Sequence, residues 1–185
     1  MKIFGIDPGS DRTGYGCIET AGGRHHLVVC GSLSAPARST FPEKLKHVHA
    51  GLAALLTRYR PDCVAVESIF YARNVRSALK LGHARGVALL AAAEAGLAVS
   101  EYAPTEIKLA VVGYGRAEKH QVQQMIKLLL GLDAPPSSHD AADALAVALC
   151  HLHSATGVIA ERAAADRAAA ARPATTMRSW RDYRP

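Results

Sequence analysis

Short apolar runs and turn residues dominate the first third of the chain. An apolar run at residues 2–6 stops at Asp7-Pro8-Gly9, where proline and glycine favour a turn. Two further β-like runs, at residues 15–19 and 25–32, flank the sequence Ala21-Gly22-Gly23-Arg24, which is typical of a hairpin turn. This pattern predicts three antiparallel strands, the first of which ends on an aspartate.

Helical and strand-like patterns then alternate. Apolar residues recur at helical spacing over residues 41–60, and the continuous apolar run 63–66 is typical of a strand buried on both faces that ends on Glu67. The remaining predictions are helices at about 74–95, from 104, at 117–130 and at 141–153, and a strand at 97–101. The order predicts an α/β fold, in which a mixed sheet of three antiparallel strands followed by parallel crossovers is flanked by helices.

The composition changes after residue 153. Large apolar residues become rare, and residues 154–185 contain six arginines, three acidic residues and many alanines. Such a segment cannot bury a core. We therefore predict a folded domain at 1–153 and a tail at 154–185, in which an Ala-rich helix precedes a disordered basic end.

The overall composition is that of an ordinary globular protein. Of 185 residues, 49% are hydrophobic and 21% are charged, and the formal net charge is +6. Neither a membrane span nor a signal peptide is expected, which predicts a cytoplasmic protein. The four cysteines have no zinc-site spacing; Cys17 and Cys30 could face each other across the hairpin, but reduced thiols are the favoured interpretation.

Four carboxylates are candidate metal ligands. Asp7 and Glu67 each end a predicted strand, while Asp140 and Asp143 are spaced i, i+3 on the last helix and so project from one face. Each has a structural alternative, such as a turn residue for Asp7 or a helix-dipole partner for Asp140. Together they favour a hard, oxygen-only site for Mg²⁺ or Mn²⁺.

A basic segment follows Glu67. No acidic residue occurs between Glu67 and Glu94, whereas four basic residues do: Arg73, Arg76, Lys80 and Arg85. This concentration of charge is compatible with a polyanionic partner, although a solvated helix face explains it as well.

Several motifs in order resemble the RuvC family of bacterial Holliday junction resolvases, which have a ribonuclease H-like fold. The resemblance covers roughly residues 1–153. It rests on Ile6-Asp7-Pro8-Gly9-Ser10 with Thr13-Gly14-Tyr15-Gly16, Ala65-Val66-Glu67 with Phe70, Ser77-Ala78-Leu79-Lys80-Leu81-Gly82 with Ala84-Arg85-Gly86, Val111-Val112-Gly113, Ala117-Glu118-Lys119, and Asp140-Ala141-Ala142-Asp143-Ala144-Leu145-Ala146.

This resemblance implies a homodimeric endonuclease that nicks two opposed strands of a four-way DNA junction and cooperates with the RuvA-RuvB branch-migration complex. The residues that match the family's catalytic acids are Asp7, Glu67, Asp140 and Asp143, which would hold two Mg²⁺ or Mn²⁺ ions. Lys108 and Lys119 match basic positions near the scissile phosphate. Phe70, followed by Tyr71, matches an aromatic residue that probes the junction centre. Some members carry His in place of Asp140, and His139 is a candidate minor participant.

Three other functions are alternatives to this interpretation. Actin-like ATPases share an Asp-x-Gly after a strand, but they need a second copy of the unit, and no G-x-x-x-x-G-K-[ST] motif is present, so no nucleotide cofactor is expected. A nuclease for RNA:DNA hybrids remains open, because carboxylates alone do not define the substrate. A non-catalytic junction-binding protein is the third alternative, but the presence of all four acids argues against it. A dimer face is predicted at Leu79, Leu81, Val87, Leu89 and Leu90, with a core role as its alternative.

Overall fold

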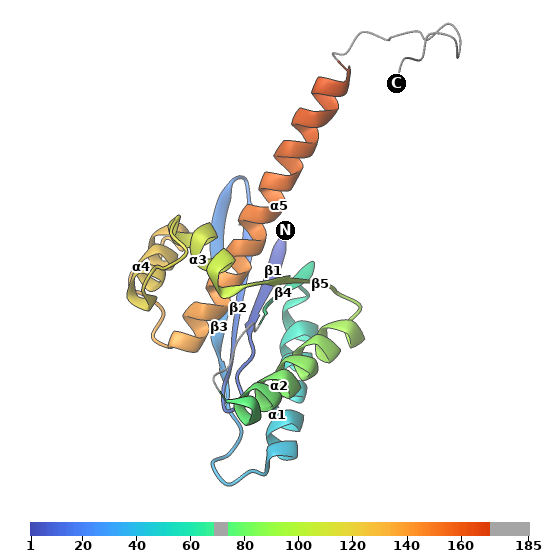
Figure 1. Ribbon diagram of the computed structural model, residues 1–185, viewed down its shortest axis with the longest axis vertical. Coiled ribbons are helices and arrows are strands. Elements are labelled where there is room, and N and C mark those ends of the chain that lie inside the picture. Colours follow the sequence, from blue (N-terminus) through green and yellow to red (C-terminus); the bar gives the residue numbers. More distant parts are fainter. Residues whose placement is uncertain (69–73, 171–185) are drawn as a thin grey trace, which may run out of the picture. The chain divides into compact units, whose positions relative to one another are not determined.

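The computed structural model describes residues 1–68 and 74–170, with side-chain surroundings given up to residue 155. Its centre is a five-stranded sheet in the order β3-β2-β1-β4-β5 (Figure 1). The strands are β1 (Lys2–Asp7), β2 (Thr13–Ala21), β3 (Arg24–Leu33), β4 (Cys63–Glu67) and β5 (Ala98–Tyr102). The first three strands pair antiparallel, and β1-β4 and β4-β5 pair parallel, which confirms the predicted mixed sheet.

Helices cover both faces of the sheet. They are α1 (Phe41–Tyr59), α2 (Val75–Glu94), α3 (Pro104–Val112), α4 (Lys119–Leu130) and α5 (His139–Ala170). On one face, Phe4 and Ile6 pack with α1 and α2, and on the other, Ile3 and Ile18 pack with α3, α4 and α5. Successive side chains of β1 therefore pack into two separate cores, because side chains alternate between the two faces of a strand.

Local sequence explains where α1 begins and which face it buries. The backbone N–H of Thr40 donates a hydrogen bond to Glu43 Oε2 at 2.7 Å, which satisfies one of the donors that a helix start leaves free. The buried residues Val48, Leu52 and Leu56 are four positions apart and so form one stripe that faces the sheet.

Helix α5 lies unusually close to the sheet. A Cβ atom on Gly5 would lie 2.0 Å from the carbonyl oxygen of Ala144, and one on Gly14 would lie 2.0 Å from that of Asp140. Any side chain at these two strand positions would therefore displace the helix. The glycines allow α5 to approach until the backbone itself makes contact, which sets the position of its acidic first turns.

The chain divides into two units, Met1–His153 and Ser154–Pro185. Helix α5 extends to Ala170, in line with the Ala-rich helix predicted after residue 153. None of the helices within the described ranges is long and apolar enough to cross a membrane.

The cysteines are all free thiols. Cys17 pairs with Val29 in the β2-β3 ladder, and Cys30 pairs with Gly16, so the two side chains point to opposite faces of the sheet. Cys17 belongs to the core beside α1 and α2, whereas Cys30 packs against the other core. A Cys17–Cys30 disulfide is therefore excluded by register.

Candidate active site

Two adjacent strand ends form the base of the site. In the parallel β1-β4 pair, Ile6 is the partner of Val66, so the next residues, Asp7 and Glu67, lie side by side at the same edge of the sheet. Since both strands run in the same direction, their carboxylates leave the core at one place. The structure thus brings together the two acids that the sequence placed at strand ends.

Helices α5 and α4 add a third carboxylate and a lysine. Asp143 lies in the second turn of α5, and Lys119, the first residue of α4, donates a hydrogen bond from Nζ to Asp143 Oδ2 at 2.9 Å. The Asp143 side chain is 29% exposed and that of Lys119 is 67% exposed, so the ion pair sits at the rim of the site. This geometry holds Asp143 toward the sheet end.

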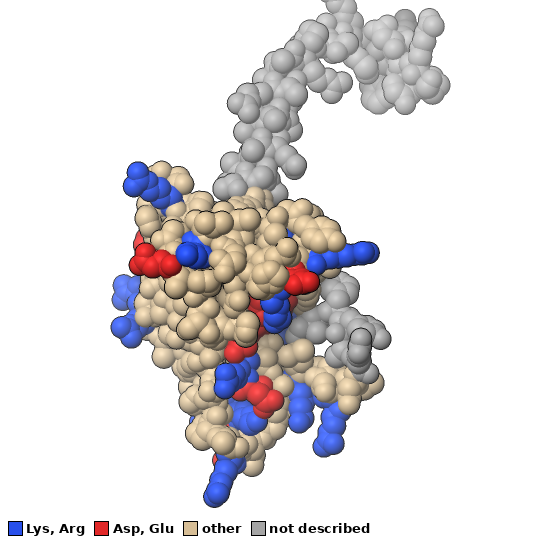
Figure 2. Space-filling view, turned by 90° about the vertical axis from the view of Figure 1, so that its left-hand side faces the viewer, with Lys and Arg blue, Asp and Glu red and all other residues tan. Residues whose placement is uncertain are grey.

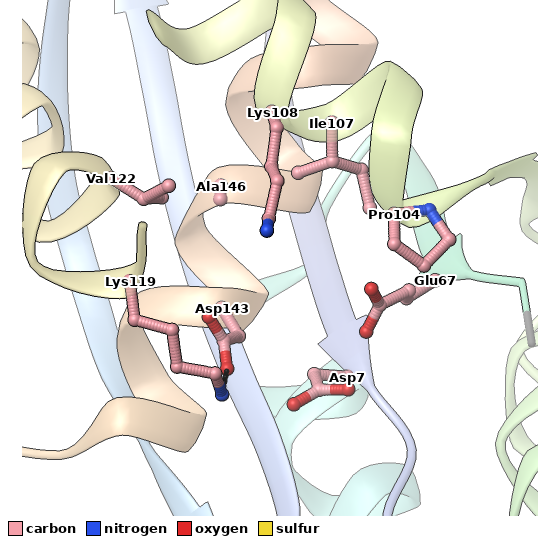
Figure 3. A pocket seen from close by; sticks show the side chains of 9 residues that line it. All are labelled: Asp7, Glu67, Pro104, Ile107, Lys108, Lys119, Val122, Asp143 and Ala146. Carbon is pink, nitrogen blue, oxygen red and sulfur yellow. Dashed lines mark hydrogen bonds and ion pairs between the residues drawn. The ribbon is translucent and has the colours of Figure 1, made fainter. Parts of the chain in front are cut away.

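These residues surround a cavity of about 330 Å³. Figure 3 shows Asp7 and Glu67 on one side, Asp143 with Lys119 on another, and Lys108 reaching in from α3. The complete lining is Asp7, Glu67, Pro104, Ile107, Lys108, Lys119, Val122, Asp143 and Ala146. The cavity therefore combines three acids and two lysines with an apolar wall.

Negative charge is crowded in this cavity. Burial, a hydrogen bond with Glu67 and the charges of Glu67, Asp143 and Asp140 raise the pKa of Asp7 to about 8. Burial also raises the pKa of Glu67, although its hydrogen bond with Asp7 and the charges of Lys119 and Lys108 work against this. Without a bound cation, Asp7 and Glu67 share a proton near neutral pH, because two adjacent buried carboxylates cannot both ionise easily.

Lys119 responds to the same field. Its hydrogen bond with Asp143, opposed by burial and supported by the charges of Asp143, Asp7 and Glu67, raises the pKa of its ammonium group. Lys119 therefore stays protonated, and its positive charge partly compensates the negative charge of the carboxylates.

Asp140 lies one turn before Asp143 on α5 and does not line the cavity, but its charge contributes to the raised pKa of Asp7. The neighbouring His139 contacts Gln123, with Nδ1 and Nε2 of the two side chains 3.0 Å apart. Asp140 is therefore a peripheral member of the acidic group in this structure.

The predicted basic contacts separate into different surroundings. The guanidinium of Arg85 forms an ion pair with Glu101 on β5. Arg76 is exposed near the start of α2, and Lys80 lies over the ring of Phe41 at 5.8 Å from its centroid. Phe70, Tyr71 and Arg73 lie outside the described residues. Figure 2 shows Lys and Arg side chains spread from the top to the bottom of one face, with acidic side chains among them.

Sequence reasoning missed the apolar wall of the cavity. Pro104 and Ile107 come from the first turns of α3, Val122 from α4, and Ala146 from α5. Ala146 is spaced i, i+3 from Asp143 and so lies on the same helix face, which is the one signal that could have indicated it. The other three positions depend on how the helices pack.

Comparison with known proteins identifies the family. A family model described as crossover junction endodeoxyribonuclease RuvC matches residues 3–151. The proteins of that name from Syntrophomonas wolfei and Heliobacterium modesticaldum are 51% and 52% identical, over 83% and 88% of this chain and 90% and 100% of theirs.

Solved structures agree. RuvC of T. thermophilus in complex with a Holliday junction substrate superposes with a TM-score of 0.79 at 37% identity, covering 84% of this chain and 94% of that chain. The yeast mitochondrial Holliday junction resolvase Ydc2, at 13% identity and a TM-score of 0.61, over 82% of this chain and 77% of its own, shares the fold. The mixed sheet with its helices is thus the ribonuclease H-like fold that the sequence indicated, and the chain belongs to the RuvC family of crossover junction endodeoxyribonucleases.

Proposed function

We propose that this chain nicks two opposed strands of a four-way DNA junction. Family membership makes it an endodeoxyribonuclease. One observation carries the assignment to the residues: Asp7, Glu67 and Asp143 meet Lys108 and Lys119 around one cavity. Such a set can hold metal ions and a phosphodiester at the same place.

The donors fit hard divalent cations. RuvC-family nucleases are metal-dependent, and the site offers carboxylate oxygens only, which suits Mg²⁺ or Mn²⁺. In the described part of the chain, no three acidic, histidine or cysteine side chains are already grouped as ligands of one ion. A cation bound there would replace the proton of Asp7 and Glu67 and the ammonium group of Lys119 beside Asp143. We therefore assign Asp7, Glu67, Asp143 and the more peripheral Asp140 as ligands of two ions.

The chain's own residues then perform three tasks. Ions bound there would generate a nucleophilic water and stabilise the leaving 3′ oxygen in an in-line displacement. Lys108 of α3 and Lys119 of α4 both line the cavity with the carboxylates, so a phosphate entering it meets two positive charges (Figure 3). Lys119 offsets charge that develops on the phosphoryl oxygens, and the apolar wall of Ile107 and Val122 limits the access of other water molecules.

Cutting two opposed strands requires two such sites, and we assign a second copy of the chain to an apolar groove. The groove has a volume of about 500 Å³ and lies between α1 and α2, away from the acidic cavity. Of the predicted dimer face, Leu79, Val87 and Leu90 line it, and Leu81 and Leu89 do not. Val87 and Leu89 both pack against the core beside α1 and α2. Leu79 is 60% and Leu90 51% exposed, and the two line the same groove, so they form part of one apolar patch instead of standing singly on the surface. Cooperation with the RuvA-RuvB complex follows from the family alone and stays a prediction.

The function is tested by substrate competition. The protein is incubated with Mg²⁺ or Mn²⁺ and a labelled four-way junction, a plain duplex or an RNA:DNA hybrid. We expect paired nicks that leave 5′ phosphates in the junction only. Preferential cutting of the hybrid would favour the ribonuclease alternative, and binding without cutting would favour the non-catalytic one.

A further inference from the structure

A second polar cavity lies beside the loop that leaves the catalytic strand β1. It has a volume of about 230 Å³ and is lined by residues of three separate segments: Ser10, Asp11, Ser39, Phe41, Lys44 and Lys80. Ser10 and Asp11 belong to the β1-β2 loop, Phe41 and Lys44 to the first turns of α1, and Lys80 to α2. None of the nine residues that line the acidic cavity takes part in it.

The carboxylate of Asp11 occupies this cavity in the way that an anionic ligand would. Lys44 Nζ lies 2.5 Å from Asp11 Oδ1. A hydrogen bond from Lys44 and its charge, followed by the charge of Lys80 and a hydrogen bond from Ser10, lower the pKa of Asp11 below its usual range. Lys44 thus binds this carboxylate directly, while Lys80, whose Nζ lies 5.8 Å from the centroid of the Phe41 ring, and Ser10 line the same cavity. Two ammonium groups and a hydroxyl around one cavity are a donor set that also suits a phosphate.

The exposures show which partner is fixed and which can leave. The Lys44 side chain is only 27% exposed, whereas that of Asp11 is 77% exposed. An ion pair with one partner this exposed contributes little to stability, because water and salt screen it, so it breaks easily. Asp11 can therefore swing into solvent while Lys44 stays in place.

The cavity has a defined distance from the chemistry. Ser10 follows Asp7 by three residues, and three residues span at most about 11 Å. The loop is held at its far end by buried Thr13, whose hydroxyl donates to the Gly9 carbonyl at 3.4 Å. Because a DNA strand carries one phosphate per about 3.4 Å of helix axis, the cavity lies within a few nucleotides of a phosphate held at Asp7.

We propose that Ser10, Ser39, Lys44 and Lys80 form a second phosphate subsite, in which a backbone phosphate of the cleaved strand displaces the carboxylate of Asp11. The proposal rests on the proposed function and specifies how the DNA strand is held next to the cut. Lys44 and Lys80 are positioning residues here, since they fix the strand without touching the reacting atoms. Asp11 acts as an internal competitor that keeps the subsite occupied until DNA binds.

The test compares Lys44→Ala with Lys46→Ala, a change of the same charge at an exposed position on the same helix. Junction binding is measured by fluorescence anisotropy over a range of salt concentrations without divalent metal. Loss of one phosphate contact should lower the slope of log K against log salt by about one for Lys44→Ala. Lys46→Ala should leave the slope unchanged. Equal slopes for the two variants would overturn the subsite.

Asp11→Asn gives an independent readout that does not depend on the folding of the Lys44 variant. Removing the competitor should tighten junction binding several-fold, whereas Asp133→Asn, which removes a charge from an exposed loop, should tighten it less. Equal effects of the two acidic variants would contradict the proposal.

Neutral methylphosphonates locate the contact. One methylphosphonate is placed at a time within about three nucleotides of the cut. At one position it should weaken junction binding by the wild-type protein and cause no further loss of binding by Lys44→Ala. If every substitution weakens both proteins equally, the phosphate is not held by Lys44. Cleavage of the junction by the wild type with Mg²⁺ tests the proposed function separately. If the wild type cuts the junction but Lys44→Ala and Lys46→Ala show the same salt dependence of binding, the subsite is wrong and the proposed function still holds.

Discussion

Lys119 Nζ donates a hydrogen bond to Asp143 Oδ2 at 2.9 Å, so an ammonium group neutralises one of the proposed metal ligands. The same lysine faces the place where phosphate would bind. Metal binding and the release of Lys119 toward substrate are therefore coupled.

This coupling predicts opposite effects of Lys119→Gln on two measurements. The rate of junction cleavage should fall about 10²–10³-fold, because the variant loses a charge that offsets the transition state. Mg²⁺ affinity, measured by titration calorimetry, should rise, because Asp143 no longer has a competing partner. Lys127→Gln, near the other end of α4, should change neither. A parallel loss of rate and metal affinity would contradict the competition.

Removing single carboxylates should separate cleavage from binding. Asp7→Asn, Glu67→Gln and Asp143→Asn should each reduce cleavage to background but bind the junction as well as or better than the wild type, since they remove negative charge beside a phosphate. Gel cleavage and anisotropy assays measure the two properties, with Asp133→Asn as the control. Loss of junction binding in a folded Asp7→Asn protein would show that the acid has a structural role instead.

Asp140→His should retain partial activity. Asp140 does not line the cavity and acts on Asp7 through its charge, so its replacement should cost about 10–100-fold in rate. The measurement is cleavage at increasing Mn²⁺ or Mg²⁺ concentration, with Asp143→Asn alongside as the inactive reference. A complete loss that no metal concentration relieves would place Asp140 among the indispensable ligands.

The raised pKa of Asp7 predicts that metal-free protein becomes less stable as pH rises. A carboxyl group that keeps its proton to about pH 8 when folded, but loses it at about pH 3.8 when unfolded, binds more protons in the folded state between these values. The associated stability is present at low pH and is lost as pH rises toward 8. Each pKa unit corresponds to about 1.4 kcal/mol, so the loss between about pH 5 and pH 8 has an upper limit of about 4 kcal/mol.

Urea unfolding with a chelator measures this loss of stability, and either of two changes should abolish it. Asp7→Asn removes the titrating group, and Mg²⁺ replaces the proton, so its affinity should increase with pH. A wild-type stability that is flat over this range without metal would contradict the shared proton.

If the groove between α1 and α2 is the dimer face, charged residues placed in it should separate the dimer. Leu79→Glu with Leu90→Glu should halve the mass measured by light scattering, because burying two charges against a partner is costly. Leu128→Glu, at a leucine that is 71% exposed on α4, is the matched control and should stay dimeric. On a cruciform plasmid the monomer should give single nicks in place of linear product. An unchanged mass would place the interface elsewhere.

The prediction for Phe70 rests on the sequence alone, since the residue lies outside the described part of the chain. Base stacking on an aromatic ring contributes about 1–3 kcal/mol, so a ring inserted at the junction centre would hold bases apart. Phe70→Ala should keep its melting temperature, cut slowly and lose the 2-aminopurine signal at the crossover. A lowered melting temperature with normal cleavage and fluorescence would assign Phe70 to the core and pass the role to Tyr71.

The sequence predicted the elements that depend on local pattern and the acids that depend on strand ends. Apolar runs, turn residues and helical spacing located the five strands and the starts of the helices to within a few residues, and two of the predicted strands ended on Asp7 and Glu67. The parallel pairing that makes these two acids neighbours comes from the structure, as does the single helix α5 that continues past residue 153 to Ala170. Helix α4 begins at Lys119 rather than near Ala117, because Glu118 takes the cap position.

Contacts between distant segments were not predictable in this way. Arg85 belongs to a basic run of the sequence, yet it forms an ion pair with Glu101, which stands on the edge strand β5 beside β4. Asp11 and Lys44 are 33 residues apart and meet only because the β1-β2 loop reaches the start of α1. Such pairs depend on packing angles and loop paths, which periodicity does not encode.

The contact of α5 with Gly5 and Gly14 has a consequence for how substitutions should be interpreted in this molecule. The width of the gap between a helix backbone and a sheet backbone determines how far the Asp143 carboxylate stands from that of Asp7. A saturation mutagenesis map should therefore show Gly5 and Gly14 as intolerant positions although neither carries a reactive atom, and alanine should already inactivate the enzyme there, because its Cβ atom would meet the helix backbone. The absence of a Cβ atom at Gly5 and Gly14 thus defines the distance between the catalytic carboxylates as much as the acids themselves do.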